Sequence, residues 1–154
     1  MDNTCFKLWY TWTVANKNRV GVLIDKSLKN SVVEVRRQGD RIILVKLVVG
    51  DMVLNVISAY APQVGLDESA KRQFWEDLNG LIRAVPSSEK LFIEGDLNGH
   101  VGTTSAGSEA VHGGFGYGSR NQEGEEVLDF AVAFELMIAN TFFRKERISS
   151  SDLQ

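Results

Sequence analysis

The sequence predicts a mixed α/β fold, and three features of its hydrophobic pattern lead to that prediction. Several runs of β-branched and aromatic residues in the first sixty positions have the length and composition of β-strands. After Pro62 the apolar residues recur at steps of three and four, which is typical of an amphipathic helix. A further strand, built on the apolar run 91–93, is predicted at 90–94, so the chain has the order strand, helix, strand.

The first half of the chain contains five predicted strands separated by turn-forming residues. Gly39-Asp40 and Gly50-Asp51 mark tight turns, because glycine and aspartate tolerate the backbone conformations that such turns require. The two strands that flank Gly50-Asp51 are expected to pair as an antiparallel hairpin. The five strands are predicted at 6–14, 19–24, 32–37, 41–49 and 52–60.

Two helices are predicted in the second half. The first lies between Asp67, whose carboxylate can accept a backbone N–H as an N-cap, and Pro86, which stops the helix. The second is predicted at about 123–136 from the spacing of its apolar residues. Residues 137–140 are expected to begin another strand.

A glycine-rich stretch at 99–124 precedes the second predicted helix and has no clear periodicity. It lacks the Gly-Lys-Ser/Thr ending of a P-loop, and its glycines do not directly follow a strand as those of a dinucleotide fingerprint do. Long loops of this kind in compact domains are commonly functional. We expect a flexible rim over the polar residues at 95–98.

The composition indicates an ordinary soluble domain. The chain has 154 residues, of which 44% are hydrophobic and 24% are charged. Cys5 is the only cysteine, so no intrachain disulfide can form, and this favours an intracellular, non-secreted protein. No apolar run is long enough to span a membrane, and the first residues do not resemble a secretion signal.

The charge is unevenly distributed along the chain. The formal net charge is -3, yet residues 17–46 contain eight Lys and Arg against three Asp and Glu. This distribution suits a basic flank for phosphate groups and a carboxylate-rich remainder for a cation. The alternative is a solvated strand face.

The most informative polar residues stand at the ends of two predicted strands. A Gly-Asp-Leu-Asn segment at 95–98 places Asp96 and Asn98 directly after one strand, and Tyr60 closes another. Strand ends hold side chains on rigid backbone beside loops that can admit a ligand. A carboxylate can orient or deprotonate water, and an amide or phenol can stabilise phosphoryl oxygens. The pattern predicts metal-assisted phosphate chemistry with Tyr60, Asp96 and Asn98 as catalytic residues.

Each of these residues has a structural alternative. Asp96 and Asn98 could form a turn stabilised by their own side chains, and Tyr60 could be a packing residue. His100 could lie at the rim of the site or simply on a surface loop. Asn121 could brace the loop near the site or cap the second helix.

The order and spacing of these motifs resemble the endonuclease/exonuclease/phosphatase superfamily. The resemblance rests on Ser-Ala-Tyr-Ala-Pro at 58–62, Phe-Trp-Glu-Asp-Leu at 74–78 and Gly-Asp-Leu-Asn-Gly-His-Val-Gly at 95–102. It continues through Asn121 and the following helix to Ala-Asn-Thr at 139–141, and covers about residues 6–146. More narrowly, the chain resembles the plant craniofacial development protein 2-like group, which is similar to the endonuclease domains of non-LTR retrotransposons.

The resemblance implies a four-layer α/β sandwich, two packed sheets with helices outside. It implies Mg²⁺- or Mn²⁺-dependent cleavage of phosphate esters, with Tyr60 on the phosphate, Asp96 positioning the water and Asn98 stabilising the phosphoryl group. Asp96 and Asn98 would also form part of the metal site. DNA or another phosphate ester is the implied partner, and the nucleus is a location that the resemblance suggests.

The chain also departs from the family pattern. The family's first strand and its metal-binding glutamate should precede residue 1, and the family's closing Ser-Asp-His does not occur, because Leu153 follows Asp152. We therefore expect a partial, incomplete domain at 1–146 and a ragged tail at 147–154. Two functions stay open: a phosphodiester hydrolase that is weak or inactive as this fragment, or a catalytically silent module with residual phosphate or metal affinity.

Overall fold

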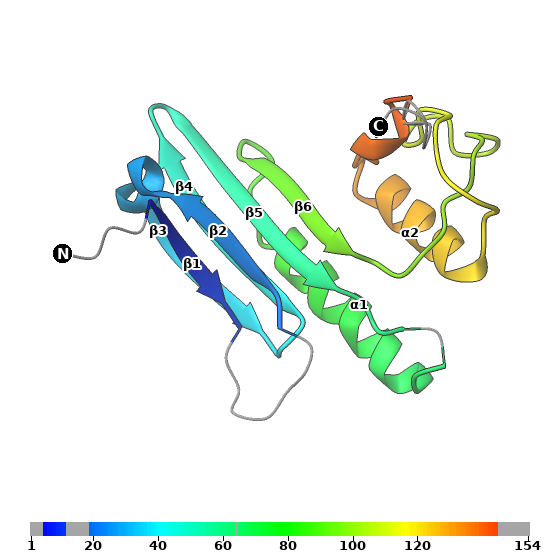
Figure 1. Cartoon of the computed structure of the whole chain (residues 1–154), viewed down its shortest axis with the longest axis horizontal. Coiled ribbons are helices and arrows are strands. Elements are labelled where there is room, and N and C mark those ends of the chain that lie inside the picture. Colours follow the sequence, from blue (N-terminus) through cyan, green and yellow to red (C-terminus); the bar gives the residue numbers. More distant parts are fainter. Residues whose placement is uncertain (1–4, 12–18, 64, 145–154) are drawn as a thin grey trace, which may run out of the picture. The chain divides into compact units, whose positions relative to one another are not determined.

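The computed structural model describes residues 5–11, 19–63 and 65–144, and the chain divides into two compact units, Met1–Leu97 and Asn98–Gln154 (Figure 1). The first unit contains the strands and one helix. The second contains the glycine-rich loop and the other helix. The predicted tail at 147–154 lies outside the described residues, and the partial domain over 1–146 stays a prediction.

The first unit contains two β-sheets. Strands β1 (Phe6–Tyr10) and β2 (Gly21–Asp25) pair antiparallel in one of them. The other sheet has four strands in the order β3 (Val32–Gln38), β4 (Ile42–Val49), β5 (Met52–Tyr60) and β6 (Lys90–Asp96). In this sheet β3, β4 and β5 are antiparallel neighbours, while β6 runs parallel to β5. The predicted α/β class is confirmed, and the two sheets with helices are consistent with a partial α/β sandwich.

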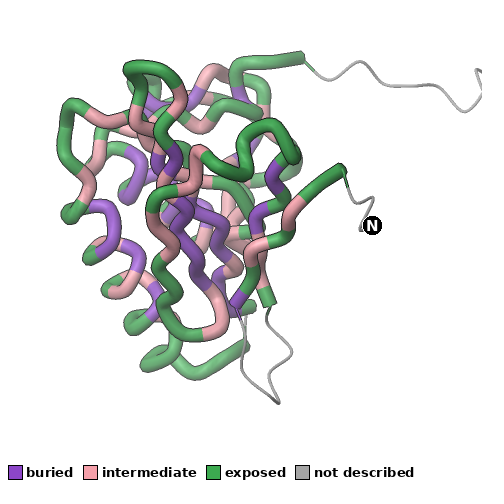
Figure 2. Tube along the Cα trace, turned by 90° about the vertical axis from the view of Figure 1, so that its left-hand side faces the viewer, coloured by how far each residue is buried: buried purple, intermediate pink, exposed green. Residues whose placement is uncertain are grey.

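One hydrophobic core lies between the two sheets. It combines Val22 and Ile24 of β2 with Ile43, Val45 and Leu47, which alternate along one face of β4. Ile43 and Val45 are completely buried, and Figure 2 colours the buried stretches of the chain purple. Burying a side chain of this size contributes roughly 1.5–3 kcal/mol to stability. The short 3₁₀ helix η1 (Lys26–Ser31) connects β2 to β3.

Helix α1 (Glu68–Arg83) joins β5 to β6 and has the amphipathic face predicted for it. Its side chains Phe74, Leu78, Leu81 and Ile82 are buried. Asp67 caps the helix, as predicted: its carboxylate accepts the backbone N–H and the hydroxyl of Ser69. The hydroxyl bond is the main reason that the pKa of Asp67 lies below its usual value.

The second unit contains α2 (Gln122–Ala133) and the 3₁₀ helix η2 (Ala139–Thr141). The strand expected to begin at 137–140 is wrong, because this segment turns into η2. Glu135 has φ 53, a left-handed conformation that follows the end of α2 and redirects the chain. Ile138 then donates its N–H to Val111 O at 2.9 Å, and Thr141 donates back to Ile138 O. In this apolar segment Ile138 packs against the cluster of Val111, Leu128 and Ala131.

A charged network connects β4, β5 and the residue before β6. Lys46 Nζ lies 2.9 Å from a Glu89 carboxylate oxygen, and the Asn55 amide donates to the same oxygen at 2.7 Å. Asn55 is completely buried, and the side chain of Glu89 is only 16% exposed. The hydrogen bond from Asn55, followed by that from Lys46, lowers the pKa of Glu89 below its ordinary 4.5.

The pKa of Glu89 is lower in the folded state than in the unfolded state. The ionised Glu89 carboxylate therefore stabilises the fold fully above the unfolded-state pKa of 4.5, and this stabilisation is lost as the pH falls through the folded-state pKa. Glu89→Gln should therefore destabilise the chain most near pH 7, and the deficit relative to wild type should shrink at acidic pH. Urea unfolding at several pH values measures this difference, with the exposed Glu76→Gln as the control. A deficit that does not change with pH would contradict the assignment.

Candidate functional site at the ends of β5 and β6

Tyr60 and Asp96 occupy neighbouring positions at the ends of two parallel strands. The register of β5 and β6 pairs Tyr60 directly with Asp96. The pairing continues one residue further, because Ala61 donates its N–H to Asp96 O at 2.9 Å. Adjacent strands are spaced about 4.8 Å apart, so the two residues start from neighbouring backbone positions. The structure thus brings together the two strand ends that the sequence singled out.

Gly95 makes this close pairing possible. Its φ is 127°, which L-amino acids with side chains rarely adopt, and a Cβ at this position would lie 1.9 Å from Ala59 O. Only glycine fits both the conformation and the space. The glycine of the Gly-Asp-Leu-Asn segment therefore sets the path by which β6 delivers Asp96.

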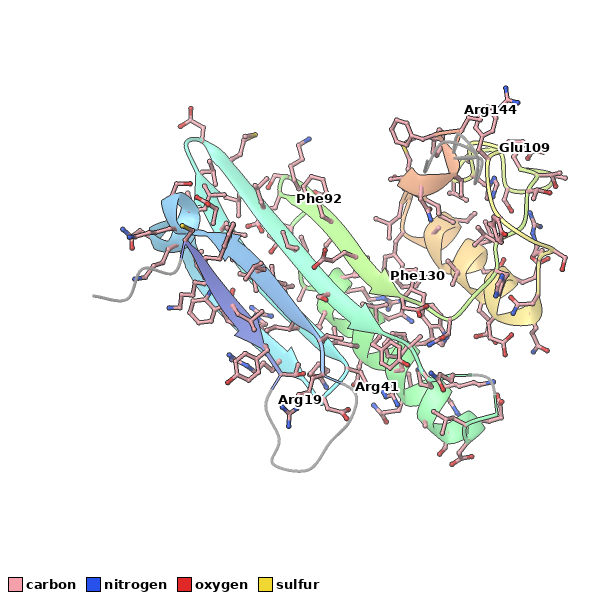
Figure 3. All side chains as sticks on the ribbon, in the orientation of Figure 1. Arg19, Arg41, Phe92, Glu109, Phe130 and Arg144 are labelled. Carbon is pink, nitrogen blue, oxygen red and sulfur yellow. The ribbon has the colours of Figure 1, made fainter. Side chains whose placement is uncertain are left out.

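Arg41 is a residue of this site that sequence reasoning assigned only to the basic flank. Its Nη1 donates to Tyr60 O at 3.2 Å, and its guanidinium carbon lies 5.5 Å from the centre of the Tyr60 ring. Figure 3 labels Arg41 beside the end of β5. The signal that could have identified Arg41 is the register of the β4–β5 hairpin. When Val49 pairs with Met52 next to the turn, the same register places Arg41 opposite Tyr60 at the far end.

The phenol of Tyr60 is oriented by Gln63, which sequence reasoning also missed. Gln63 Nε2 donates to Tyr60 Oη at 2.8 Å. A phenol has one hydrogen to donate as well as lone pairs that accept, so the bond from Gln63 leaves the Tyr60 hydrogen available to another acceptor. Tyr60 is half-buried and Asp96 is exposed, so the pair combines a fixed ring with a carboxylate that solvent reaches.

The remaining predicted site residues, Asn98, His100 and Asn121, belong to the second unit, so their grouping with Tyr60 and Asp96 stays a prediction. Asn98 is half-buried and has φ 52. His100 is exposed on the loop. Asn121 both caps α2 and braces the loop. Its side-chain oxygen accepts the Gly124 N–H as the α2 N-cap, and it also accepts the His100 N–H of the loop.

The loop at 99–120 differs from the flexible rim that we expected, because side chains hold it. Arg120 donates to Val101 O and Thr104 O at 3.2 Å, and to Ala106 O at 3.4 Å. His112 is 1% exposed; it accepts the Gly114 N–H on Nδ1, so its Nε2, 3.2 Å from Gly102 O, is the nitrogen that donates. Several of the glycines in this loop lie where a Cβ would collide with a neighbouring part of the chain. The glycine content of the loop therefore indicates close packing and not flexibility.

Several residues of the basic flank have partners within the first unit. Arg36 pairs with Glu34 at 2.5 Å, Arg37 donates to Tyr10 O at 2.9 Å, and Lys46 belongs to the Glu89 network. These contacts favour the alternative of an ordinary strand face for those residues. Arg41, in the turn directly before β4, is the residue of this flank that lies beside Tyr60.

The donor types at the strand end suit a hard cation, but the set is small. Asp96 offers a carboxylate and Asn98 an amide oxygen, and Mg²⁺ in phosphate-processing sites commonly takes one or two carboxylates together with substrate phosphates and water. Within the described parts of the chain, no group of three or more His, Cys, Asp or Glu residues could hold a metal ion. A joint metal site of Asp96 and Asn98 therefore stays a prediction, and it would need further ligands from substrate phosphates and water.

Comparison with known proteins shows a clear similarity over most of the chain. No protein-family model matches the chain. Over 129 residues, 84% of its length, the sequence is 32% identical to proteins from Tragulus javanicus and Bos taurus, both named craniofacial development protein 2. The chain is similar to craniofacial development protein 2. It spans about a fifth (22%) of the length of these two craniofacial development protein 2 chains. Among the residues described, no helix is both long and apolar enough to cross a membrane.

Gly95→Ala should destabilise the first unit by roughly 2–5 kcal/mol, because the new methyl group overlaps Ala59 O in a backbone conformation that alanine disfavours. Urea unfolding measures the loss. Gly80→Ala is the matched control, since a Cβ there meets nothing within 4 Å, and in a helix this change should stabilise by about 0.5–1 kcal/mol. Equal effects of the two substitutions would contradict the role given to Gly95.

Proposed function

We propose that the chain carries the phosphate-cleaving site of a divalent-metal-dependent phosphodiester hydrolase of the endonuclease/exonuclease/phosphatase type. The observation that supports the proposal best is the parallel pairing of Tyr60 with Asp96 at the ends of β5 and β6. The similarity to craniofacial development protein 2 is compatible with a nuclease-like role. Membership of the superfamily, and of its plant retrotransposon-like group, is part of the proposal.

In this proposal the side chains divide the chemistry between them. Asp96 orients the attacking water and accepts its proton, and Tyr60 donates its phenol hydrogen to a phosphoryl oxygen. Asn98 stabilises the same phosphoryl group through its amide. Arg41, fixed against the Tyr60 ring, offsets the negative charge that develops on the phosphate.

Mg²⁺ or Mn²⁺ is the proposed cofactor, and Asp96 and Asn98 are the residues that would contribute to holding it. When bound, such a cation neutralises charge on the phosphoryl and leaving oxygens. The proposed substrate is DNA, with another phosphate ester as the alternative, and an intracellular, nuclear location fits that substrate. The resemblance of the strand-end motifs to retrotransposon endonucleases supports this choice.

A second function is a module that binds phosphate or metal without cleaving. The observation that favours it is the small ligand set, since the described residues contain no group of three metal-ligating side chains. Tyr60, Gln63 and Arg41 would still present a phenol, an amide and a cation to a phosphate. The two functions share Tyr60 and Arg41 as phosphate contacts and differ in turnover.

Asp96→Ala should abolish nicking of supercoiled plasmid in Mg²⁺ or Mn²⁺, with a loss of roughly 10²-fold or more, because it removes the proposed general base. The assay uses the full chain with and without EDTA. Glu94→Ala is the matched control, an exposed carboxylate two residues earlier on the same strand. Equal nicking by wild type and Asp96→Ala would contradict the hydrolase and leave the binding module.

Arg41→Ala should weaken binding of a duplex oligonucleotide in EDTA and reduce the slope of log affinity against log salt by about 0.9, the value for one lost phosphate contact. Fluorescence anisotropy at four salt concentrations measures the slope. Arg36→Ala removes the same charge from β3, where the side chain is 48% exposed and paired with Glu34. An identical slope for the two variants would exclude a specific phosphate contact at Arg41.

A further inference from the structure

Three hydrogen bonds of Asn121 connect the start of α2 to the residues that follow Asn98. Asn121 donates its N–H to His100 O at 3.1 Å, and its Oδ1 accepts the His100 N–H at 2.9 Å. The same oxygen accepts the Gly124 N–H at 2.9 Å as the N-cap of α2. One asparagine side chain therefore joins a helix terminus to the loop. We refer to the three hydrogen bonds as the Asn121 clamp.

Two glycines bring the two segments into direct contact at this clamp. A Cβ on Gly124 would lie 1.9 Å from His100 O, and a Cβ on Gly99 would lie 2.7 Å from Glu123 O. Neither position has room for a side chain. The clamp thus fixes the backbone of residues 99 and 100 against the first turn of α2.

Asn98 lies directly before this fixed segment and has a strained backbone. Its φ of 52° is a left-handed conformation, which asparagine tolerates better than most residues but which the surrounding structure must still impose. Strained backbone is commonly concentrated at functional sites. The amide of Asn98 is also the group to which the proposed function gives a contact with the phosphoryl group.

We propose that Asn121 is a positioning residue for Asn98. It holds the His100 backbone on the α2 terminus, and through Gly99 this keeps Asn98 in its left-handed conformation with its amide in a single orientation. Arg120 supports the arrangement from the preceding position, because its guanidinium secures the carbonyls of Val101 and Thr104. The inference rests on the proposed function for the role of Asn98, although the clamp itself does not.

Two substitutions at residue 121 separate clamping from capping. Asn121→Asp keeps an oxygen acceptor of the same reach and places negative charge at a helix N-terminus, where it is favourable. Asn121→Ser keeps a good N-cap for Gly124, but its hydroxyl is too short to reach the His100 N–H as well. Asn140→Ser, an exposed asparagine of the same unit, is the matched control.

Nuclear magnetic resonance of the labelled full chain reads the clamp without any need for activity. In Asn121→Ser the His100 amide should exchange about tenfold faster than in wild type, and the Asn98 backbone shifts and HN–Hα coupling should move toward an averaged φ. Asn121→Asp and Asn140→Ser should match wild type. Unchanged Asn98 shifts in Asn121→Ser would overturn the proposal, as would equal changes in Asn121→Asp.

A nicking assay adds the functional readout. Asn121→Ser should lower kcat roughly tenfold with little change in KM, since it disturbs a group that acts in the transition state, and Asn121→Asp should restore kcat. Wild-type kcat in Asn121→Ser, in a chain whose activity depends on Asp96, would overturn the positioning role. Absence of nicking in every variant would contradict the proposed function alone, because the Asn98 backbone measurement still decides whether Asn121 positions that residue.

Discussion

The parallel pairing of β5 with β6 is the constraint on which the proposed site depends. The register that places Tyr60 beside Asp96 is extended by the hydrogen bond from Ala61 N–H to Asp96 O, and it exists only because Gly95 has no side chain. A strand pair of this kind fixes two backbones at about 4.8 Å spacing without help from the side chains at its end. The pairing is therefore formed by backbone groups and not by the side chains of Tyr60 and Asp96.

Each of the two units holds its polar side chains in its own way. Arg41 and Gln63 fix the ring and the hydroxyl of Tyr60, and both contacts come from segments next to β5 in the sheet or in the sequence. In the second unit Asn121 and Arg120 hold the loop through backbone groups, so its conformation does not depend on a packed core alone. Preorganised groups of this kind are what electrostatic catalysis of phosphate transfer requires.

Local signals predicted most of the elements. The hairpin around Gly50, the Asp67 cap and the amphipathic α1 follow from residues near one another in sequence, and all three occur in the structure. Arg41 was missed because its role needs the register of the hairpin carried to its far end. The strand predicted at 137–140 was wrong because a left-handed Glu135 and the hydrogen bond from Ile138 to Val111 outweigh the preference of a short apolar run for a strand. The loop was expected to be flexible because it is rich in glycine. Glycine content alone, however, does not distinguish a mobile loop from one whose backbone segments pack closely.

The central claim is that β5 and β6 pair in the register that places Tyr60 beside Asp96, and cross-strand nuclear Overhauser effects in the labelled chain test it most directly. The account predicts contacts between the backbone protons of residues 59–61 and those of residues 95–96, together with a slowly exchanging Ala61 amide bonded to Asp96 O. Contacts shifted by two residues, or a rapidly exchanging Ala61 amide, would contradict it.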